Sequence, residues 1–508
     1  MKKLILVFTL LMELSIYAQP CKEVVGYYPN WQWYDRNKLV APTSIDYSKY
    51  SIINYSFFEP LSDGSIQITD PWADKNILLG PINWSTAPAG YDTSYDFGNP
   101  AYHQSGQKLS DYCHQNNVKL LPSIGGWTLS DNFPAIASDP SKRQTFAQNC
   151  VQLIQAFGFD GIDLDWEYPG FSDHAGTPAD KVNFTLLLQE IRTAIDNYGN
   201  SVGKTMYLSI AVSGDPSKMD DVEWGNVAAI VDKINLMSYD FFGAFDQFTN
   251  HNSPLYAPAQ GNAEFNCDAA ITRLINQYGV DPAQINLGLA FYGRSQITNS
   301  TPDLHIASTG NADLATFGVD DGTPLYYNVL LNSNSFDRYW DDQAKVPYLL
   351  GKNGLNTFLS YDDEQSIGLK AQYIIDHNLG GAIIWEITGD YIETAPGSGQ
   401  ILGTPLADTL NNVFCHYTGN TASIDEEKME FNLKVYPNPS EGEVLIQNKN
   451  AIPVIYKILD SKGSVISSNK MIQANSSIRL DEFMEKGVYF IYFLINDEYV
   501  TVKKVLII

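Results

Sequence analysis

Four carboxylic acids lie within eight residues of an otherwise apolar part of the chain. The stretch from Phe159 to Gly170 reads FDGIDLDWEYPG, and its acids are Asp160, Asp163, Asp165 and Glu167. Placing so many carboxylates among Ile, Leu and Trp side chains costs solvation energy, so we expect them to have a chemical role. If the stretch is a β-strand, Asp163, Asp165 and Glu167 share one face because successive side chains alternate between faces.

The spacing of these acids predicts an unusual protonation state. Neighbours on one face of a strand are roughly 6.6 Å apart. Carboxylates this close in a cleft cannot all ionise cheaply, so at least one should hold a proton near neutral pH and could act as a general acid. The alternatives are a solvated surface loop or a calcium site. Calcium loops favour Gly and Asn between their ligands, whereas apolar residues alternate with the acids here, so we expect no metal and no cofactor.

Eight short apolar or β-branched runs predict the strands that position these acids. Segments of helical periodicity, such as Ser141 to Ala156 and Val182 to Tyr198, lie between several of them. Alternating strands and helices predict a parallel sheet, and eight units over roughly 400 residues predict an α/β fold, the (β/α)8 TIM barrel. The runs are residues 23–28, 51–57, 119–123, 161–166, 207–212, 233–239, 285–291 and 381–386.

The spacing between the seventh and eighth runs is too long for one barrel unit. About 90 residues separate them, where a helix and two loops need about 30. We therefore expect an α+β insertion over residues 295–358, within a barrel domain that spans residues 19–417.

Composition and charge limit the possible partners. The 508 residues suffice for one large domain with accessories. A formal net charge of −26 argues against nucleic acid or an anionic membrane as partner. Aromatic residues make up 13% of the chain, including 31 Tyr and 9 Trp, and they suit stacking on the apolar faces of sugar rings.

The N-terminus indicates export. Residues 1–18 begin with Lys2 and Lys3, continue with an apolar run and end at Ala18, the pattern of a secretory signal peptide. The segment is too short to span a membrane, and no later segment is apolar enough to do so. Five widely spaced cysteines fit neither a zinc site nor a dense disulfide framework. Cys21 and Cys415 bracket the barrel domain and could pair, and the odd count leaves at least one buried, inert thiol.

Polar and aromatic residues end five of the predicted strands, where barrels build their active sites. The third strand ends in SIGGW at 123–127, the fourth in the acid row, the sixth in MSYD at 237–240, the seventh in FYGR at 291–294 and the eighth in WE at 385–386. DGIDLDWE at 160–167 resembles the DxxDxDxE motif of the family 18 glycoside hydrolases, the chitinases. The other four elements match the same family in the same order, and the resemblance covers about residues 22 to 416.

The resemblance implies roles for the acids. Glu167 would protonate the glycosidic oxygen and later act as base, in a retaining reaction whose nucleophile is the 2-acetamido oxygen of the substrate. Asp165 would orient that acetamido group, Asp163 would share a proton with Asp165, and Tyr239 would donate to the acetamido oxygen. Ser123 would support the row from the neighbouring strand, whereas Asp160 would be structural at the strand entry.

The resemblance also implies sugar contacts. Trp385 would form an apolar floor under the distorted sugar, and Tyr27, Met237, Asp240 and Arg294 would line the same subsite.

Two further aromatic positions concern the sugar platforms. Many chitinases place a Trp shortly after the MxYD element, where this chain has FFGAF ending at Phe245. Phe245 offers a smaller stacking surface on the leaving-group side, whereas the other platform, Trp127, is present.

The C-terminal region has a different composition. After an acidic, polar linker at 418–430, residues 431–508 contain nine Lys and Arg against eight Asp and Glu, which is +1 and leaves −27 upstream. Short β-rich runs there predict a small all-β sandwich. The sequences YPNPSEG at 436–442 and KGVYF at 486–490 resemble the C-terminal sorting domain of the type IX secretion system. A chitin-binding module is the alternative, but the region has no Trp.

These resemblances imply a secreted or cell-surface enzyme that hydrolyses β-1,4 bonds of chitin or chitooligosaccharides. We expect a monomer whose C-terminal region engages the type IX machinery. The alternatives are an endo-β-N-acetylglucosaminidase acting on N-glycans and a non-catalytic chitin-binding lectin.

Overall fold

The computed structural model describes residues 22–88 and 100–416, and the C-terminal segments 433–437, 440, 443–449, 453–460, 465–480, 486–495 and 498–507. The predicted signal peptide at 1–18 and linker at 418–430 lie outside the described residues. The barrel region and the C-terminal strands form two compact units, which are treated separately below.

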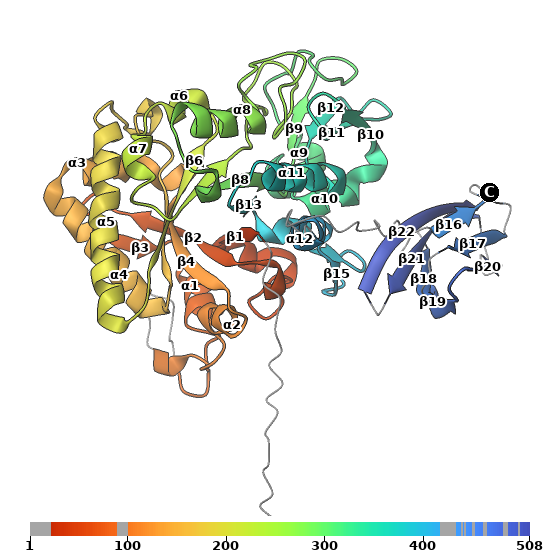
Figure 1. Ribbon diagram of the computed structural model, residues 1–508, viewed down its shortest axis with the longest axis horizontal. Coiled ribbons are helices and arrows are strands. Elements are labelled where there is room, and N and C mark those ends of the chain that lie inside the picture. The colour runs from red at the N-terminus through yellow and green to blue at the C-terminus, as the bar shows by residue number, and fades with distance from the viewer. Residues whose placement is uncertain are drawn as a thin grey trace, which may run out of the picture. The chain divides into compact units, whose positions relative to one another are not determined.

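Eight parallel strands close into a barrel (Figure 1). The ring runs β1, β13, β8, β7, β6, β5, β4, β2 and back to β1. Each strand coincides with one of the eight predicted apolar runs, so the predicted (β/α)8 barrel is confirmed. The strands are β1 (Glu23–Pro29), β2 (Ile52–Pro60), β4 (Lys119–Gly125), β5 (Gly161–Asp165), β6 (Tyr207–Ser213), β7 (Lys233–Met237), β8 (Ile285–Ala290) and β13 (Gly381–Trp385). The short β3 (Ile66–Ile68) pairs antiparallel with β2.

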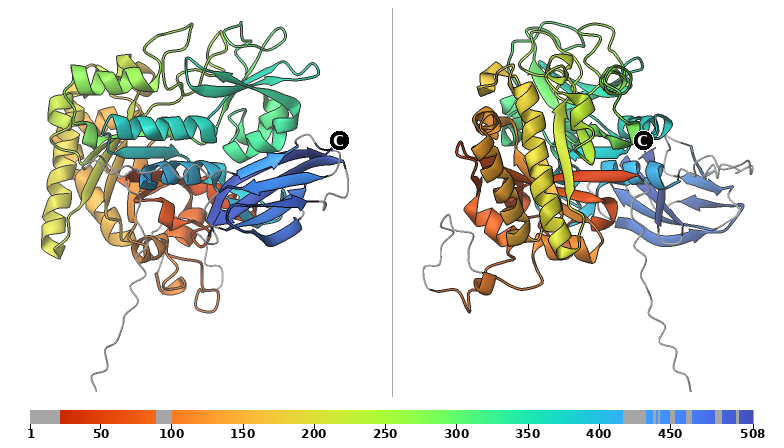
Figure 2. Two further views of the ribbon diagram at one scale, coloured as in Figure 1. Left: turned by 45° about the vertical axis from the view of Figure 1, so that its right-hand side comes forward. Right: turned by 60° about the vertical axis from the view of Figure 1, so that its left-hand side comes forward.

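Helices cover the outside of the barrel, and the long α4 (Pro140–Phe157) and α5 (Asp180–Val202) run side by side there (Figure 2). The sequence sets the ends of α4. The Asp139 carboxylate accepts hydrogen bonds from the N–H groups of Ser141 and Lys142, Pro140 occupies the first turn, and Gly158 ends the helix with φ of 75°.

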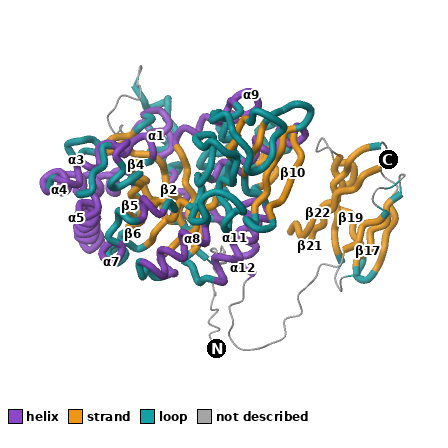
Figure 3. The backbone as a smooth tube through the Cα atoms, turned by 90° about the horizontal axis from the view of Figure 1, so that it is seen from above, coloured by secondary structure: helices purple, strands orange, loops and turns teal. Residues whose placement is uncertain are grey.

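The other helices are shorter, and Figure 3 shows their distribution around the strands. They are α1 (Pro71–Leu78), α2 (Leu109–Gln115), α3 (Phe133–Ser138), α6 (Pro216–Met219), α7 (Trp224–Val227), α8 (Cys267–Thr272), α9 (Leu314–Phe317), α10 (Tyr326–Asn332), α11 (Glu364–Asp376) and α12 (Pro405–His416).

A separate antiparallel sheet lies in the chain between β8 and β13, within the long interval noted in the sequence. Its order is β10 (Phe336–Asp341), β11 (Val346–Gly351), β12 (Thr357–Ser360) and β9 (Arg294–Ile297). Helices α9 and α10 belong to the same interval, which therefore has α+β character. After β13, a two-stranded ribbon of β14 (Ile392–Glu393) and β15 (Ile401–Gly403) precedes α12.

The C-terminal unit consists of two antiparallel sheets, ordered β16-β17-β20 and β19-β18-β21-β22. Its apolar core includes Val444, Ile458, Ile491 and Phe493. The predicted all-β fold of this region is confirmed. The strands are β16 (Leu433–Tyr436), β17 (Val444–Asn448), β18 (Val454–Asp460), β19 (Val465–Ile472), β20 (Ser476–Leu480), β21 (Gly487–Ile495) and β22 (Glu498–Ile507).

Three cysteines, Cys113, Cys150 and Cys267, are buried free thiols, and burial raises the pKa of each. The possible pair of Cys21 with Cys415 falls outside what the structure describes, because Cys21 is not among the described residues. Within the described part of the chain, no helix is both long and apolar enough to cross a bilayer.

Candidate active site

The register of three neighbouring strands brings polar groups to Asp163. On β5, Asp163 is the register partner of Ser123 on β4 and of Ser209 on β6. Residues in register on adjacent strands point to the same face of a sheet. The three side chains therefore face the barrel interior together.

Asp163 accepts four hydrogen bonds in this interior. Its Oδ2 accepts from the hydroxyls of Tyr27 at 2.9 Å and Ser123 at 2.8 Å, and its Oδ1 accepts from Ser209 at 2.5 Å and Asn235 at 3.1 Å. Burial raises the pKa of Asp163, while these donors oppose the rise by stabilising the carboxylate. The structure thus brings Tyr27 and Ser123 directly to the acid row.

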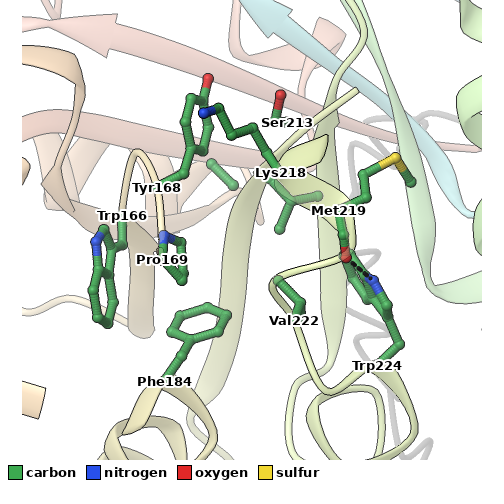
Figure 4. Close-up of a pocket in the computed structure, with 11 residues that line it drawn as sticks. Trp166, Tyr168, Pro169, Phe184, Ser213, Lys218, Met219, Val222 and Trp224 are labelled. Atoms are coloured by element: carbon green, nitrogen blue, oxygen red, sulfur yellow. Dashed lines mark hydrogen bonds between the residues drawn. The ribbon is translucent and has the colours of Figure 1, made fainter. Parts of the chain in front are cut away.

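The apolar residues of the same strand point outward, as the alternation predicts. Ile162, Leu164 and Trp166 belong to the large core between strands and helices. Trp166 packs edge-on against Phe184 of α5, with ring centroids 5.6 Å apart. Figure 4 shows both rings in a small apolar pocket that also contains Pro169 and Met219. Trp166 and its neighbours thus anchor the outer side of β5 against α5.

Two glycines explain why β4 ends in SIGG. Gly125 has φ of 110° and Gly126 has φ of 92°. A Cβ atom on Gly125 would lie 2.1 Å from the Asp165 carbonyl oxygen, so only glycine fits there. The N–H of Gly126 donates to that same carbonyl at 2.8 Å. The end of β4 is therefore tied to the end of β5 at the second acid.

Asp165 is buried, and its Oδ1 has no hydrogen-bond partner among the described residues. Burial and the neighbouring charges of Glu167 and Asp163 raise the pKa of Asp165 well above its ordinary value. Burial and these charges therefore favour the protonated form of Asp165, and its Oδ1 is a polar atom available for a bound molecule.

Glu167 lies where the strand has just ended. Its N–H donates to the Ser130 hydroxyl at 2.9 Å, and its carbonyl oxygen is 2.7 Å from Nδ1 of His174. Burial raises the pKa of the Glu167 carboxyl to about 7; the nearby Asp240 adds to the rise and the Tyr168 hydroxyl opposes it. A carboxyl with this pKa can give and take a proton at neutral pH.

Residues after β7 and β8 form a second polar group. Asp240 has φ of 60° and accepts hydrogen bonds through Oδ1 from Tyr292 and from Nε of Arg294. Tyr239 is buried, and its ring packs edge-on against Tyr292 with centroids 6.0 Å apart. Burial raises the pKa of the Tyr239 hydroxyl, with the charges of Asp165, Asp240 and Glu167 adding to the rise, so it remains a hydrogen-bond donor.

Aromatic rings form the next part of the site. Trp385, which ends β13, stacks on Phe57 with centroids 5.7 Å apart and contacts Tyr27 at 5.6 Å. The half-exposed Trp31 lies 6.1 Å from Phe57 and 6.3 Å from Trp385. Met237 and Trp385 both pack against the apolar cluster inside the barrel that contains Tyr27 and Tyr239.

The two predicted platforms are both exposed but have different surroundings. Trp127 is 53% exposed and contacts Tyr168 and His174. Phe245 is 64% exposed, and the guanidinium of Arg294 lies 5.3 Å from its ring centre. Phe245 therefore contacts Arg294, which binds Asp240, whereas Trp127 packs against the loop that follows Glu167.

Some residues of this site did not emerge from the sequence. Ser209 and Asn235 complete the Asp163 network, Ser130 and His174 hold the Glu167 backbone, and Phe57 and Trp31 extend the aromatic wall. Ser209 and Asn235 did leave a signal, because each is a polar residue within a buried parallel strand. Trp31, Ser130 and His174 lie in short 3-10 helices and Phe57 lies within the apolar β2, and none of these positions has a distinctive pattern.

The arrangement combines Glu167, whose pKa is about 7, with Asp165, whose pKa is raised well above its ordinary value. The Asp163 carboxyl accepts four hydrogen bonds next to them, and aromatic rings surround the group. Such a site can protonate a leaving oxygen and hold a flat, partly apolar molecule. Among the described residues, no group of three His, Cys, Asp or Glu side chains is arranged to hold a metal ion.

Comparison with known proteins agrees with this chemistry. The family model of the glycosyl hydrolases family 18 matches residues 23–390, and that of the secretion system C-terminal sorting domain matches residues 434–508. Chitinase A1 of Niallia circulans is 36% identical over 410 residues, which cover 73% of this chain and 57% of that protein. Chitinase ChiA of Flavobacterium johnsoniae is 31% identical over 93% of this chain and 33% of its own length.

A solved structure also resembles the chain. The chitinase ChiA74 from Bacillus thuringiensis superposes with a TM-score of 0.65 at 27% identity, covering 95% of this chain and 84% of that one. The chain thus spans about half or less of the length of the two sequence relatives named above and most of this structural one.

Proposed function

The chain belongs to glycosyl hydrolase family 18, and from this we propose that it is a secreted chitinase that hydrolyses β-1,4 bonds between N-acetylglucosamine units. The reaction retains the anomeric configuration and uses the acetamido group of the substrate as nucleophile. The observation that carries the proposal is the buried acid row, in which burial raises the pKa of Asp165 well above its ordinary value and that of Glu167 to about 7.

In the first step, Glu167 transfers its proton to the glycosidic oxygen as that bond breaks. The acetamido oxygen attacks the anomeric carbon and forms a cyclic oxazolinium ion. Asp165, whose Oδ1 has no hydrogen-bond partner among the residues that the structure describes, accepts the acetamido N–H and stabilises the positive charge by passing its proton toward Asp163. The Tyr239 hydroxyl donates to the acetamido group and holds it for attack.

In the second step, Glu167 takes a proton from a water molecule that attacks the anomeric carbon. The ring opens, the acetamido group is restored and the configuration is retained. The four hydrogen bonds to Asp163 stabilise its carboxylate form against burial, whereas burial and neighbouring charges favour the protonated form of Asp165, which gives the two acids different roles.

The aromatic wall supports an extended polysaccharide as substrate. Trp385 supplies a floor for the reacting sugar, and Trp31 and Phe57 continue the apolar surface away from it. Tyr27, Met237, Asp240 and Arg294 line the same subsite, and Ser123 supports the acid row from β4. Trp127 and Phe245 carry sugars on exposed faces. All of these residues come from one chain, so we propose that the enzyme acts as a monomer, which light scattering would test.

The match of residues 434–508 to the sorting domain supports export. We propose that this region directs the protein to the type IX secretion machinery and that the enzyme acts outside the cell or on its surface.

Turnover of chitohexaose by the wild type and by Glu167→Gln tests the activity. We expect the variant to bind the oligomer but to lose turnover by at least about 10³-fold. Retention of activity by the variant would remove Glu167 from the proposed role. Faster cleavage of a high-mannose glycopeptide than of chitohexaose would instead indicate an endo-β-N-acetylglucosaminidase, and binding without turnover by the wild type would indicate a lectin.

A substrate lacking one acetyl group tests the nucleophile. An oligomer with glucosamine in the reacting position has no acetamido oxygen, so we expect no cleavage at that bond. Cleavage there would show that a protein carboxylate, with Asp165 the first candidate, acts as nucleophile.

A further inference from the structure

One histidine joins the proposed general acid to the exposed Trp127. His174 is the last residue of a short 3-10 turn (Ser172–His174) and follows Glu167 by seven residues. It belongs to none of the motifs at the strand ends. Its side chain is half-buried at the rim of the site.

The imidazole of His174 holds the backbone of Glu167. Its Nδ1 lies 2.7 Å from the Glu167 carbonyl oxygen. Since a carbonyl oxygen can only accept, Nδ1 carries the hydrogen. On the other side, the Glu167 N–H donates to Ser130 at 2.9 Å. Two side chains from different loops therefore fix the peptide groups on both sides of the acid.

The same ring supports Trp127. The centroids of the His174 and Trp127 rings are 4.6 Å apart, and Phe171 lies 5.9 Å from Trp127 and 5.4 Å from His174. The Lys218 ammonium in turn covers the Phe171 ring at 3.7 Å. Lys218 also lines the small pocket behind β5, together with Tyr168 (Figure 4). Trp127 therefore has one side packed against this cluster, while about half of its surface remains open to a sugar.

We propose that His174 is a positioning residue that couples occupation of the Trp127 platform to the placement of Glu167. A sugar stacked on Trp127 restrains the neighbouring His174 ring, whose N–H binds the Glu167 backbone. Binding energy at Trp127 therefore helps to hold the Glu167 carboxyl at the glycosidic oxygen. A misplacement of about 1 Å in such a group costs roughly 10²-fold in rate, so a single hydrogen bond that holds the acid can matter. This inference rests on the proposed chitinase function.

Three substitutions separate the two contacts of the ring. His174→Phe keeps an aromatic ring beside Trp127 but loses the N–H, His174→Asn restores a side-chain N–H without the ring, and His174→Ala removes both. Asp173→Ala, at an exposed neighbour in the same turn, is the matched control. Each is assayed with chitohexaose, with kcat and KM determined separately and Tm measured for folding.

We expect His174→Phe to lower kcat about ten-fold with KM within about two-fold, because one hydrogen bond to the acid loop is lost. His174→Asn should recover part of that kcat, and His174→Ala should also raise KM for the hexamer. The effects of His174→Ala and Trp127→Ala on kcat/KM should be less than additive, because the two share one contact. In the pH profile of kcat/KM, the fall at high pH should begin at a lower pH in His174→Phe. A looser loop admits water, which reduces the burial of Glu167 and lowers its pKa.

The controls distinguish failure of the inference from failure of the function. An active wild type with inactive Glu167→Gln, but with His174→Phe equal to wild type in kcat and in its pH limb, would overturn the role of His174 alone. Strict additivity with Trp127→Ala would overturn the coupling. A wild type that does not cleave chitohexaose would instead refute the proposed function.

Discussion

The pKa of Glu167 predicts where the activity is lost as the pH rises. The proposed mechanism needs a protonated Glu167 in the free enzyme, and its pKa is about 7 because the carboxyl is buried. The protonated fraction is then about one half at pH 7, about 9% at pH 8 and about 1% at pH 9. We therefore expect kcat/KM to fall about five-fold from pH 7 to pH 8 and about ten-fold for each further pH unit.

Two substitutions should shift the alkaline limb of the pH profile, the fall of kcat/KM at high pH, in opposite directions. Asp240 raises the pKa of Glu167 by its charge, so Asp240→Asn should shift the limb to lower pH. The Tyr168 hydroxyl lowers the pKa of Glu167, so Tyr168→Phe should shift the limb to higher pH. Since kcat/KM reports pKa values of the free enzyme, changes in substrate affinity do not move the limb itself.

The assay is kcat/KM for a fluorogenic N-acetylglucosamine oligomer from pH 4 to pH 9 at constant ionic strength, with enzyme stability checked at each pH. A limb at or below pH 5, near the ordinary pKa of Glu, would refute the argument that burial tunes Glu167. Shifts of both variants in the same direction would show that Asp240 and Tyr168 do not act on Glu167 as the structure indicates.

Three further predictions concern stability. Replacing Asp163 by Ala leaves four buried donors without an acceptor and should lower the free energy of unfolding in urea by about 3 kcal/mol. Asp163→Asn should lower it by less, and equal losses would contradict the network. Burial raises the pKa of Glu386 to about 8 and that of Asp390 to about 7, so the folded chain holds more protons than the unfolded one between about pH 4.5 and 8. Stability should therefore fall by as much as about 6 kcal/mol from pH 5 to pH 8.5, and a rise in Tm over this range would contradict the assignment. Gly125→Ala should lower the free energy of unfolding by about 2 kcal/mol or more and impair turnover, because its Cβ would meet the Asp165 carbonyl at 2.1 Å; wild-type stability would contradict the close approach.

Local sequence was sufficient for the strands of the barrel. Each of the eight runs is apolar, short and bounded by turn residues, and a fully buried parallel strand requires that pattern. The alternation in DGIDLDWE also indicated which side chains face inward, because the period of a strand is two and Trp166 pairs with the outer helices. Spacing likewise showed that the stretch before β13 is too long for one barrel unit.

Tertiary structure decided the partners of those side chains. Ser209 and Asn235 meet Asp163 only because β5, β6 and β7 are in register, and the register of parallel strands depends on the whole closed sheet. His174 reaches the Glu167 carbonyl through the turn that follows the strand, and turns of this kind carry no periodic signal.

The sequence by itself thus determined that an acid row sits at the end of a buried strand and that at least one of its members should be protonated. The tertiary structure decided which one holds which role. Asp163 is surrounded by donors, Asp165 has an oxygen with no partner in the described part of the chain, and Glu167 is buried with a pKa of about 7. The physical reason is that a pKa depends on burial and on donors from distant strands, and neither of these is local in sequence.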